Sequence, residues 1–118
     1  MAWHFAEGTP VYLQIIDIFK IKIISGEYPP NFKLPTVREF TKIIGVNPNT
    51  IQKSLAKIEE EGLIYTTSTV GKFVTDDMKK IAQIREEYLL SKIKEIIDDF
   101  SKLGIQKEEL LALIASVN

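Results

Sequence analysis

The side chains best suited to recognising another molecule are concentrated in residues 47–57 of this sequence. A helix over residues 48–61 that buries Ile51, Leu55 and Ile58 would turn other side chains outward. The outward set is Asn49, Gln52, Lys53, Ala56 and Lys57. The amides of Asn and Gln can pair with two atoms of an adenine, Lys can bind guanine or a phosphate, and Ala can approach a thymine methyl. The pattern therefore suits the edges of DNA base pairs, although an ordinary amphipathic helix has the same pattern.

No arrangement typical of catalysis or metal binding accompanies these side chains. The 118 residues include no cysteine and a single histidine, His4, which has no nucleophile or carboxylate partner at a recognisable spacing. The acidic runs at residues 59–61, 86–87 and 98–99 consist of sequence neighbours, which do not face each other on a helix. Glycine-rich phosphate-binding motifs are also missing. We therefore expect no enzymatic activity, no metal and no cofactor.

Charge is distributed unevenly along the chain. The whole sequence has a net charge of −1, with 45% hydrophobic and 26% charged residues, which is typical of a globular domain. Between residues 33 and 58, however, five cations accompany a single anion, Glu39. Such a local excess of cations attracts a phosphate backbone, but it is also found on plain solvated surfaces. No apolar run approaches the roughly 20 residues that span a bilayer, and the first residues do not resemble a signal peptide. We expect a cytoplasmic protein without a membrane partner.

The first elements that must position the polar segment are an arm and a helix. Residues 1–8 suit a short strand or an arm. Thr9-Pro10 has the pattern of a hydroxyl N-cap followed by proline at the first helical position, and Ser25-Gly26 that of a C-terminal stop. The spacing predicts a helix between these two dipeptides, followed by a loop over residues 27–34.

A helix-turn-helix is predicted next. Thr36 and Glu39 have the spacing of a capping box and open a helix that ends at Ile44. Asn47-Pro48 opens the helix over residues 48–61 after a turn of about three residues, which is helix-turn-helix spacing. The apolar residues expected on one face of the first helix are Val37, Phe40, Ile43 and Ile44.

A β-hairpin completes the N-terminal domain. Residues 63–67 and 72–75 are rich in β-branched and aromatic side chains and flank Gly71. A helix, a helix-turn-helix and a hairpin in this order predict a winged helix over residues 1–75. The expected fold is therefore mostly α with a small β wing.

Residues 76–118 predict two helices that carry an apolar seam. Within residues 76–103 apolar residues recur at spacings of four and three, the period of a heptad seam, and a second helix follows over residues 106–117. Such a pair is too small to bury its apolar faces alone, so it either folds back on the winged helix or joins a second copy. We favour a homodimer. The predicted interface comprises Ile81, Ile84, Tyr88, Leu89, Ile93, Ile96, Phe100, Leu103, Leu110 and Ile114.

Several motifs resemble, in order and spacing, the GntR family of bacterial winged-helix regulators. They lie at residues 9–15, 26, 34–39, 45–53 and 61–64. The run Asn-Pro-Asn-Thr at residues 47–50 and the two-helix tail are similar to the small YtrA subgroup. The resemblance implies a homodimeric DNA-binding transcription regulator, usually a repressor, and in this subgroup often of transporter genes. A two-fold dimer predicts an inverted-repeat operator.

The resemblance also implies DNA contacts at individual positions. Thr36 and Arg38 would act at the start of the first turn helix, where the guanidinium of Arg38 offers a fork to phosphate or guanine. On the second turn helix the implied residues are Asn47, Asn49, Thr50, Gln52 and Lys53, beside the outward Lys57. Thr36, Asn47 and Thr50 can instead serve only as cap or turn residues.

The wing departs from the pattern of the family. The usual sequence is Arg-Gly-x-Gly-x-Phe-Val, whereas residues 68–74 read Ser-Thr-Val-Gly-Lys-Phe-Val. One glycine and the preceding cation are therefore missing, and Lys72 is the wing cation that can still reach DNA. We expect weaker wing contacts than usual.

Two readings of the function remain open. The leading one is a sequence-specific DNA-binding dimer. The other is a winged helix that binds protein rather than DNA, which the low net charge and the altered wing favour. A small-molecule effector is unknown. Its pocket would lie between the domains or at the dimer interface. A bound ligand would change the spacing of the two recognition helices, the helices over residues 48–61 of the two copies, and the linker at residues 75–79 motivates this hypothesis.

Overall fold

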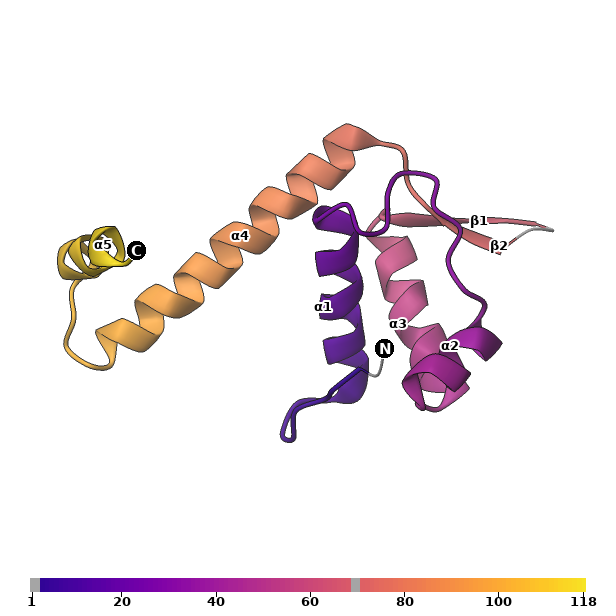
Figure 1. Cartoon of the computed structure of the whole chain (residues 1–118), viewed down its shortest axis with the longest axis horizontal. Helices are drawn as coiled ribbons and strands as arrows, with labels where there is room; N and C mark the ends of the chain where they lie inside the picture. Colours follow the sequence, from indigo (N-terminus) through magenta and orange to yellow (C-terminus); the bar gives the residue numbers. More distant parts are fainter. Residues whose placement is uncertain (1–2, 69–70) are drawn as a thin grey trace. The chain divides into compact units, whose positions relative to one another are not determined.

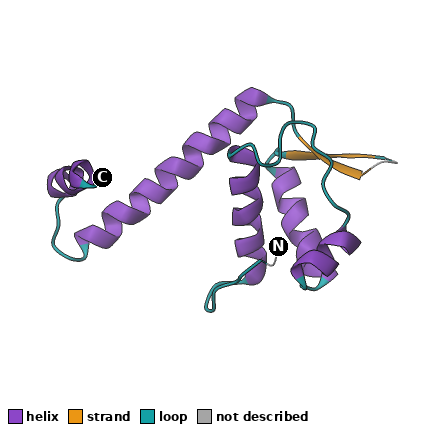
Figure 2. Ribbon diagram, viewed as in Figure 1, coloured by secondary structure: helices purple, strands orange, loops and turns teal. Residues whose placement is uncertain are grey.

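The computed structural model describes residues 3–68 and 71–118 and divides into two compact units, residues 1–82 and 83–118. The boundary lies inside a helix, whereas the sequence placed it between residues 75 and 76. Figures 1 and 2 show the order of the elements. They are α1 (Val11–Ile24), α2 (Val37–Ile44), α3 (Pro48–Glu60), β1 (Ile64–Thr67), β2 (Gly71–Val74), α4 (Met78–Ser101) and α5 (Lys107–Ser116). The predicted fold, mostly α with a two-stranded wing, is confirmed, and each predicted element ends within two residues of its observed limit.

The start of α1 differs from the prediction. Pro10, not Thr9, is the N-cap, and no side chain caps this end of the helix. Pro10 has an extended ψ of 137°, so it precedes the helix and its carbonyl accepts the first helical hydrogen bonds. Gln14 instead ties the preceding arm to the helix. Its Nε2 donates to the carbonyls of Ala6 and Thr9 at 2.9 Å each, and its Oε1 accepts from the Ala6 amide at 2.8 Å.

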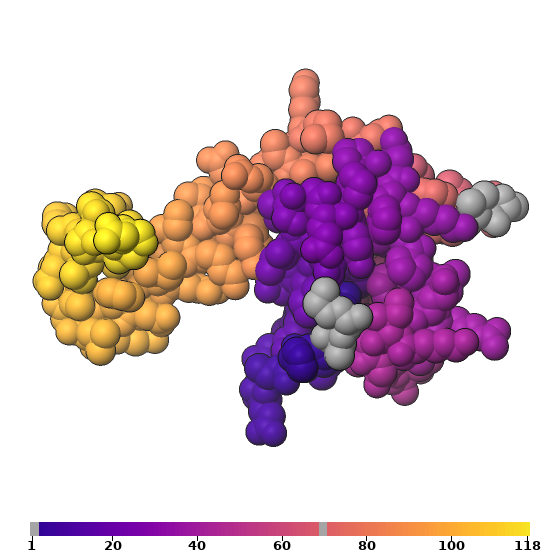
Figure 3. Space-filling model, viewed as in Figure 1, coloured from indigo at the N-terminus to yellow at the C-terminus, as the bar shows by residue number. Residues whose placement is uncertain are grey.

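The core of the N-terminal unit lies where α1 packs against α3, with α2 across one end. α1 and α2 each pack against α3, and Figure 3 shows the same face of the molecule with all its atoms. Phe19 and Phe40 meet edge to face with ring centroids 5.2 Å apart, and Trp3 of the arm packs on both rings. The fully buried aliphatic residues of the two long helices are Ile15, Ile51, Leu55 and Ile58. The Trp3 ring therefore attaches the described part of the arm to the core.

The prediction for the apolar side of α2 is only partly correct. Phe40 is buried, and Val37 and Ile44 are half-buried, but Ile43 is 47% exposed. An eight-residue helix that crosses the end of a two-helix core can insert one large side chain fully, and here the Phe40 ring occupies that place.

The hairpin is anchored to the loop that precedes α2. β1 and β2 pair antiparallel with Tyr65 opposite Phe73, and these two rings stack at 5.6 Å. The loop, predicted without regular structure, runs beside β2 as a partial third strand. The Asn31 amide donates to the Val74 carbonyl at 2.8 Å, and the Leu34 amide donates to the Lys72 carbonyl at 2.9 Å. Of the altered wing residues, Thr69 and Val70 lie outside the described residues.

The C-terminal unit contains most of α4, a turn and α5. The turn includes Gly104, whose φ of 80° is the left-handed conformation that favours glycine. No helix in the described part of the chain is long and apolar enough to cross a membrane. Large apolar side chains of α4 and α5 lie at the surface, as detailed below.

Replacement of Thr36 by alanine tests the capping box at the start of α2. The Thr36 hydroxyl accepts from the Glu39 amide, and loss of such a cap costs about 1 kcal/mol of stability. The hydrogen bond from the Thr36 backbone amide, followed by that from the Thr36 side chain, holds the pKa of Glu39 below its usual range. Thr36→Ala removes only the second of these. We expect the pKa of Glu39 to rise in Thr36→Ala. We also expect the part of the wild-type advantage that depends on the Glu39 charge to be present above the ordinary pKa of glutamate and to be lost as the pH falls through the lowered one, whereas the cap itself, which accepts from the Glu39 backbone amide, remains.

Urea unfolding and carboxyl NMR titration measure these two effects. Thr36→Ser keeps the hydroxyl and serves as the matched control. An unchanged Glu39 pKa in Thr36→Ala would contradict this assignment.

Candidate nucleic-acid interface

Caps fix the start of α2 and both ends of the turn between α2 and α3. The Thr36 hydroxyl accepts from the Glu39 amide at 3.1 Å, and the Glu39 carboxylate accepts from the Thr36 amide at 2.8 Å. Gly45 ends α2 with a φ of 78°, a conformation that favours glycine. Asn47 then caps α3 by accepting from the Asn49 amide at 2.8 Å. Thr36 and Asn47 thus both act as caps, and whether they also contact DNA stays a prediction.

The side chains of α3 divide into the two faces that the sequence predicts. Ile51, Leu55 and Ile58 are buried, while the outward set of the recognition helix is exposed. This set is Asn49, Gln52, Lys53, Ala56 and Lys57. Thr50 is half-buried, and Arg38 is exposed in the first turn of α2. The cations and amides expected to meet DNA therefore lie at the surface of one helix-turn-helix.

A polar contact that the sequence did not indicate fixes α3 on α1. Ser54 is fully buried, and its Oγ lies 3.1 Å from the carbonyl oxygen of Tyr12 and 2.9 Å from that of Thr50. At the far end of α3, the Lys20 ammonium donates to the Glu61 carboxylate at 2.9 Å. These contacts hold the outward face of α3 at a defined angle to the rest of the unit.

Shallow depressions border the outward face of α3 on two sides, and Ala56 lines both. The first has a volume of about 400 Å³, lies toward α1, and is lined by residues that include Tyr12, Leu13 and Lys53. Here the Lys53 ammonium lies 3.8 Å from the centre of the Tyr12 ring, a cation–π contact. The second, of about 570 Å³, lies toward the wing. Its lining comprises Val37, Gln52, Ala56, Glu59, Glu60 and Lys72.

The wing cation is engaged within the protein. The Lys72 ammonium donates to the Glu59 carboxylate at 2.9 Å and to the Thr66 hydroxyl at 2.8 Å, and the same hydroxyl donates to Glu59 at 2.8 Å. The hydrogen bond from Lys72, followed by that from Thr66, keeps the pKa of Glu59 below its usual range. Glu59 is not among the residues that the sequence predicts at this interface. Gln52, Ala56 and Glu59 follow one another at spacings of four and three residues, which places them on the same side of a helix. This spacing was the available signal.

The two apolar stripes of α4 do not form one seam. At 3.6 residues per turn, the stripe of Ile81, Ile84 and Tyr88 lies roughly 100° around the helix from the stripe that begins at Leu89. Ile81 and Ile84 are only 8% exposed within the single chain, and Leu110 of α5 is buried as well. These side chains have little surface left to offer a second copy, so this part of the predicted interface is not supported. Tyr88 and Phe100 are half-buried.

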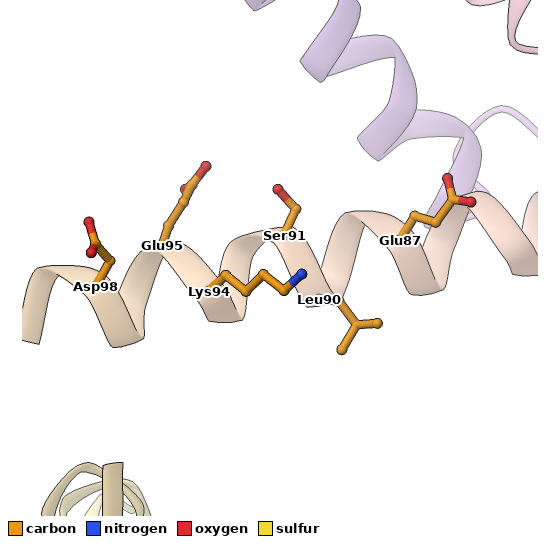
Figure 4. A pocket seen from close by; sticks show the side chains of 6 residues that line it. All are labelled: Glu87, Leu90, Ser91, Lys94, Glu95 and Asp98. Atoms are coloured by element: carbon orange, nitrogen blue, oxygen red, sulfur yellow. The ribbon is translucent and has the colours of Figure 1, made fainter. Parts of the chain in front are cut away.

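Other large apolar side chains of the C-terminal unit are exposed. They are termed the apolar surface of α4 and α5 and comprise Leu89, Leu90, Ile93, Ile96, Leu103, Leu111, Leu113, Ile114 and Val117. Another side of α4 is polar. Figure 4 shows Glu87, Ser91, Glu95 and Asp98 on that side, where they line a shallow depression, and Leu90 pointing away from them.

The helix-turn-helix and the hairpin beside it define the class of protein: a winged helix-turn-helix domain followed by a helical segment. Comparison with known families gives the same result. Residues 11–74 match the family described as bacterial regulatory proteins, gntR family. The chain belongs to the GntR family, whose members are transcriptional regulators rather than enzymes.

Individual relatives cover the helical segment as well as the winged helix. The HTH-type transcriptional repressor YtrA of Bacillus subtilis is 34% identical over 94% of this chain and 86% of its own length. A GntR family transcriptional regulator from Listeria monocytogenes superposes with a TM-score of 0.89 and 36% identity, over 97% of this chain and all of that one. The DNA-binding domain of AraR in complex with operator ORX1 covers 64% of this chain and 95% of that domain, with a TM-score of 0.57 and 26% identity.

Proposed function

We propose that the protein is a transcriptional repressor that binds an inverted-repeat operator as a homodimer, with α3 in the major groove. The observation that carries this proposal is the outward face of α3, where amides and ammonium groups lie at the surface of a rigidly packed helix. Such side chains can distinguish base pairs by their major-groove edges. The likeness to the AraR domain bound to its operator supports the same docking.

Repression is the regulatory outcome that the relatives favour. YtrA is named a repressor, and its similarity to this chain extends through the C-terminal helices. The DNA-contacting set that we propose is Thr36, Arg38, Asn47, Asn49, Thr50, Gln52, Lys53 and Lys57. A regulator of this kind represses when its bound dimer covers sequences that the transcription machinery needs.

The apolar surface of α4 and α5 supports the homodimer. Large aliphatic side chains on successive turns of α4 are exposed, with Ile93 exposed to 50% and Leu103 to 74%. Monomeric soluble proteins rarely expose contiguous apolar patches of large area. A second copy related by a two-fold axis would cover this surface with an identical one and would present two recognition helices to two half-sites. We therefore place the dimer interface on this surface rather than on Ile81 and Ile84.

Selection of bound duplexes from a random pool, followed by sequencing, tests the DNA-binding part of the proposal. We expect enrichment of an inverted repeat. On the enriched duplex, Arg38→Met and Lys53→Met should each cost about 1–3 kcal/mol of binding free energy and relax the preference at one base pair if they read bases. If they contact phosphate, all sequences should weaken and the salt slope should fall by about one.

Lys94→Met, on α4, is the matched control for loss of a single cation. Wild-type protein that binds no duplex at low salt would overturn the proposal in favour of a protein-binding winged helix. Variants with wild-type affinity and salt slope would remove Arg38 and Lys53 from the interface.

A charge placed in the apolar surface of α4 tests the dimer. Ile93→Glu should yield a folded monomer in sedimentation equilibrium, because an ionised carboxylate is costly to bury in an apolar interface. Its affinity for the two-half-site operator should fall by at least tenfold. Ser91→Glu adds the same charge on the polar side of α4, where Figure 4 places it, and should remain dimeric. A dimeric Ile93→Glu would contradict this interface.

A further inference from the structure

The wing residue Lys72 and the recognition-helix residue Glu59 form a pair across 13 positions of the sequence. Their side chains are 31% and 37% exposed, so the pair lies at the surface and not in the core. Thr66 completes a closed triangle, because its hydroxyl accepts from Lys72 and donates to Glu59. Thr66 and Lys72 are also direct partners in the register of the hairpin. Backbone pairing and side-chain contacts therefore bring the three groups together.

The two charged members of the triangle line the depression that borders the DNA-facing side of α3 under the proposed function. Gln52 and Ala56, both in the outward set, line this depression together with Glu59 and Lys72. An unneutralised carboxylate here would repel the phosphates of a docked duplex through Coulomb interaction. The pKa of Glu59 is lowered, so the group is ionised at neutral pH. Its charge must therefore be neutralised before the wing and α3 can approach DNA together.

We propose that Glu59 is a positioning residue that engages Lys72 and Thr66, and that Lys72 promotes DNA binding by neutralising Glu59 rather than by contacting a phosphate. The proposal rests on the proposed function and revises the role expected for Lys72. In the altered wing, the remaining cation, Lys72, then serves to hold the hairpin on α3 through Glu59. Glu59 then lowers non-specific affinity by withholding that cation from the DNA backbone.

This arrangement predicts opposite effects for its two charged members. Loss of the Lys72 charge leaves Glu59 unneutralised beside DNA and weakens binding. Loss of the Glu59 charge releases the Lys72 ammonium, which can then reach a phosphate, so binding to every duplex tightens and becomes more sensitive to salt. A direct phosphate contact by Lys72 predicts instead that Lys72 matters equally whether or not Glu59 is charged.

A double-mutant cycle measured by fluorescence anisotropy, with the full chain and the enriched operator duplex at several KCl concentrations, separates these cases. We expect Lys72→Met to weaken binding about two- to fivefold in the wild-type background, without the fall of about one in the salt slope that a lost phosphate contact gives. In the Glu59→Gln background Lys72→Met should abolish the gain in affinity and lower the salt slope by up to about one, because only there does Lys72 reach a phosphate. Glu59→Gln alone should tighten binding to operator and to a scrambled duplex, with a salt slope steeper by up to about one. Lys72→Arg, which keeps the ion pair, should retain wild-type affinity.

Glu60→Gln is the matched control, because Glu60 lines the same depression but pairs with Lys57 rather than Lys72. In the Glu60→Gln background Lys72→Met should have its full effect. The proposal is overturned if Lys72→Met lowers the salt slope by about one and has the same effect in the Glu59→Gln and wild-type backgrounds. Failure of the proposed function is a different outcome: in that case the wild-type protein enriches no duplex in the selection from the random pool. Circular dichroism melting of each variant confirms that loss of folding does not account for the result.

Discussion

The burial of one side of α3 against α1 determines where every other side chain of the recognition helix lies. Leu55 and Ile58 are excluded from water, and a helix that buries two such residues one turn apart has no rotational freedom left. The buried Ser54 Oγ adds a polar contact to α1, 3.1 Å from the Tyr12 carbonyl oxygen, beside its 2.9 Å contact with Thr50 within α3. Because the amide and cationic side chains on the opposite side extend from the same backbone, their positions are fixed as well. A recognition surface needs fixed positions, because a base edge is distinguished by hydrogen bonds with narrow geometric limits.

Local sequence signals predicted the elements well because each signal acts within one turn of helix. The capping pair at residues 36 and 39, proline after Asn47 and glycine at position 45 each satisfy or terminate hydrogen bonds of neighbouring residues. Thr9-Pro10 shows the limit of such patterns. The dipeptide is one residue out of register with the helix, and no side chain caps the helix; Gln14 instead ties the arm to the helix through the carbonyls of Ala6 and Thr9.

The features that the sequence could not predict depend on residues far apart in the chain. Lys53 and Lys72 were assigned from their outward position or from the resemblance, yet each is held by a partner on another element, Tyr12 and Glu59 respectively. Ile81 and Ile84 share the spacing of an exposed seam but lie on a different side of α4 and are buried. Periodicity identifies a face without identifying what covers it. Only the tertiary packing decides whether an apolar face is internal or remains for a partner.

A net charge of −1 is compatible with an affinity for a polyanion because the acids near the winged helix are engaged locally. Glu39 closes a helix cap, Glu59 is held by the wing, and Glu61 pairs with Lys20 of α1. A carboxylate whose charge is opposed at hydrogen-bond distance has a weak field beyond about one Debye length, which is roughly 8 Å at physiological salt. The exposed Arg38 and Lys53 therefore contribute more to the potential above α2 and α3 than the total charge indicates. Whole-chain charge is a poor guide to this protein because its anions serve the fold and its recognition depends on a local surface.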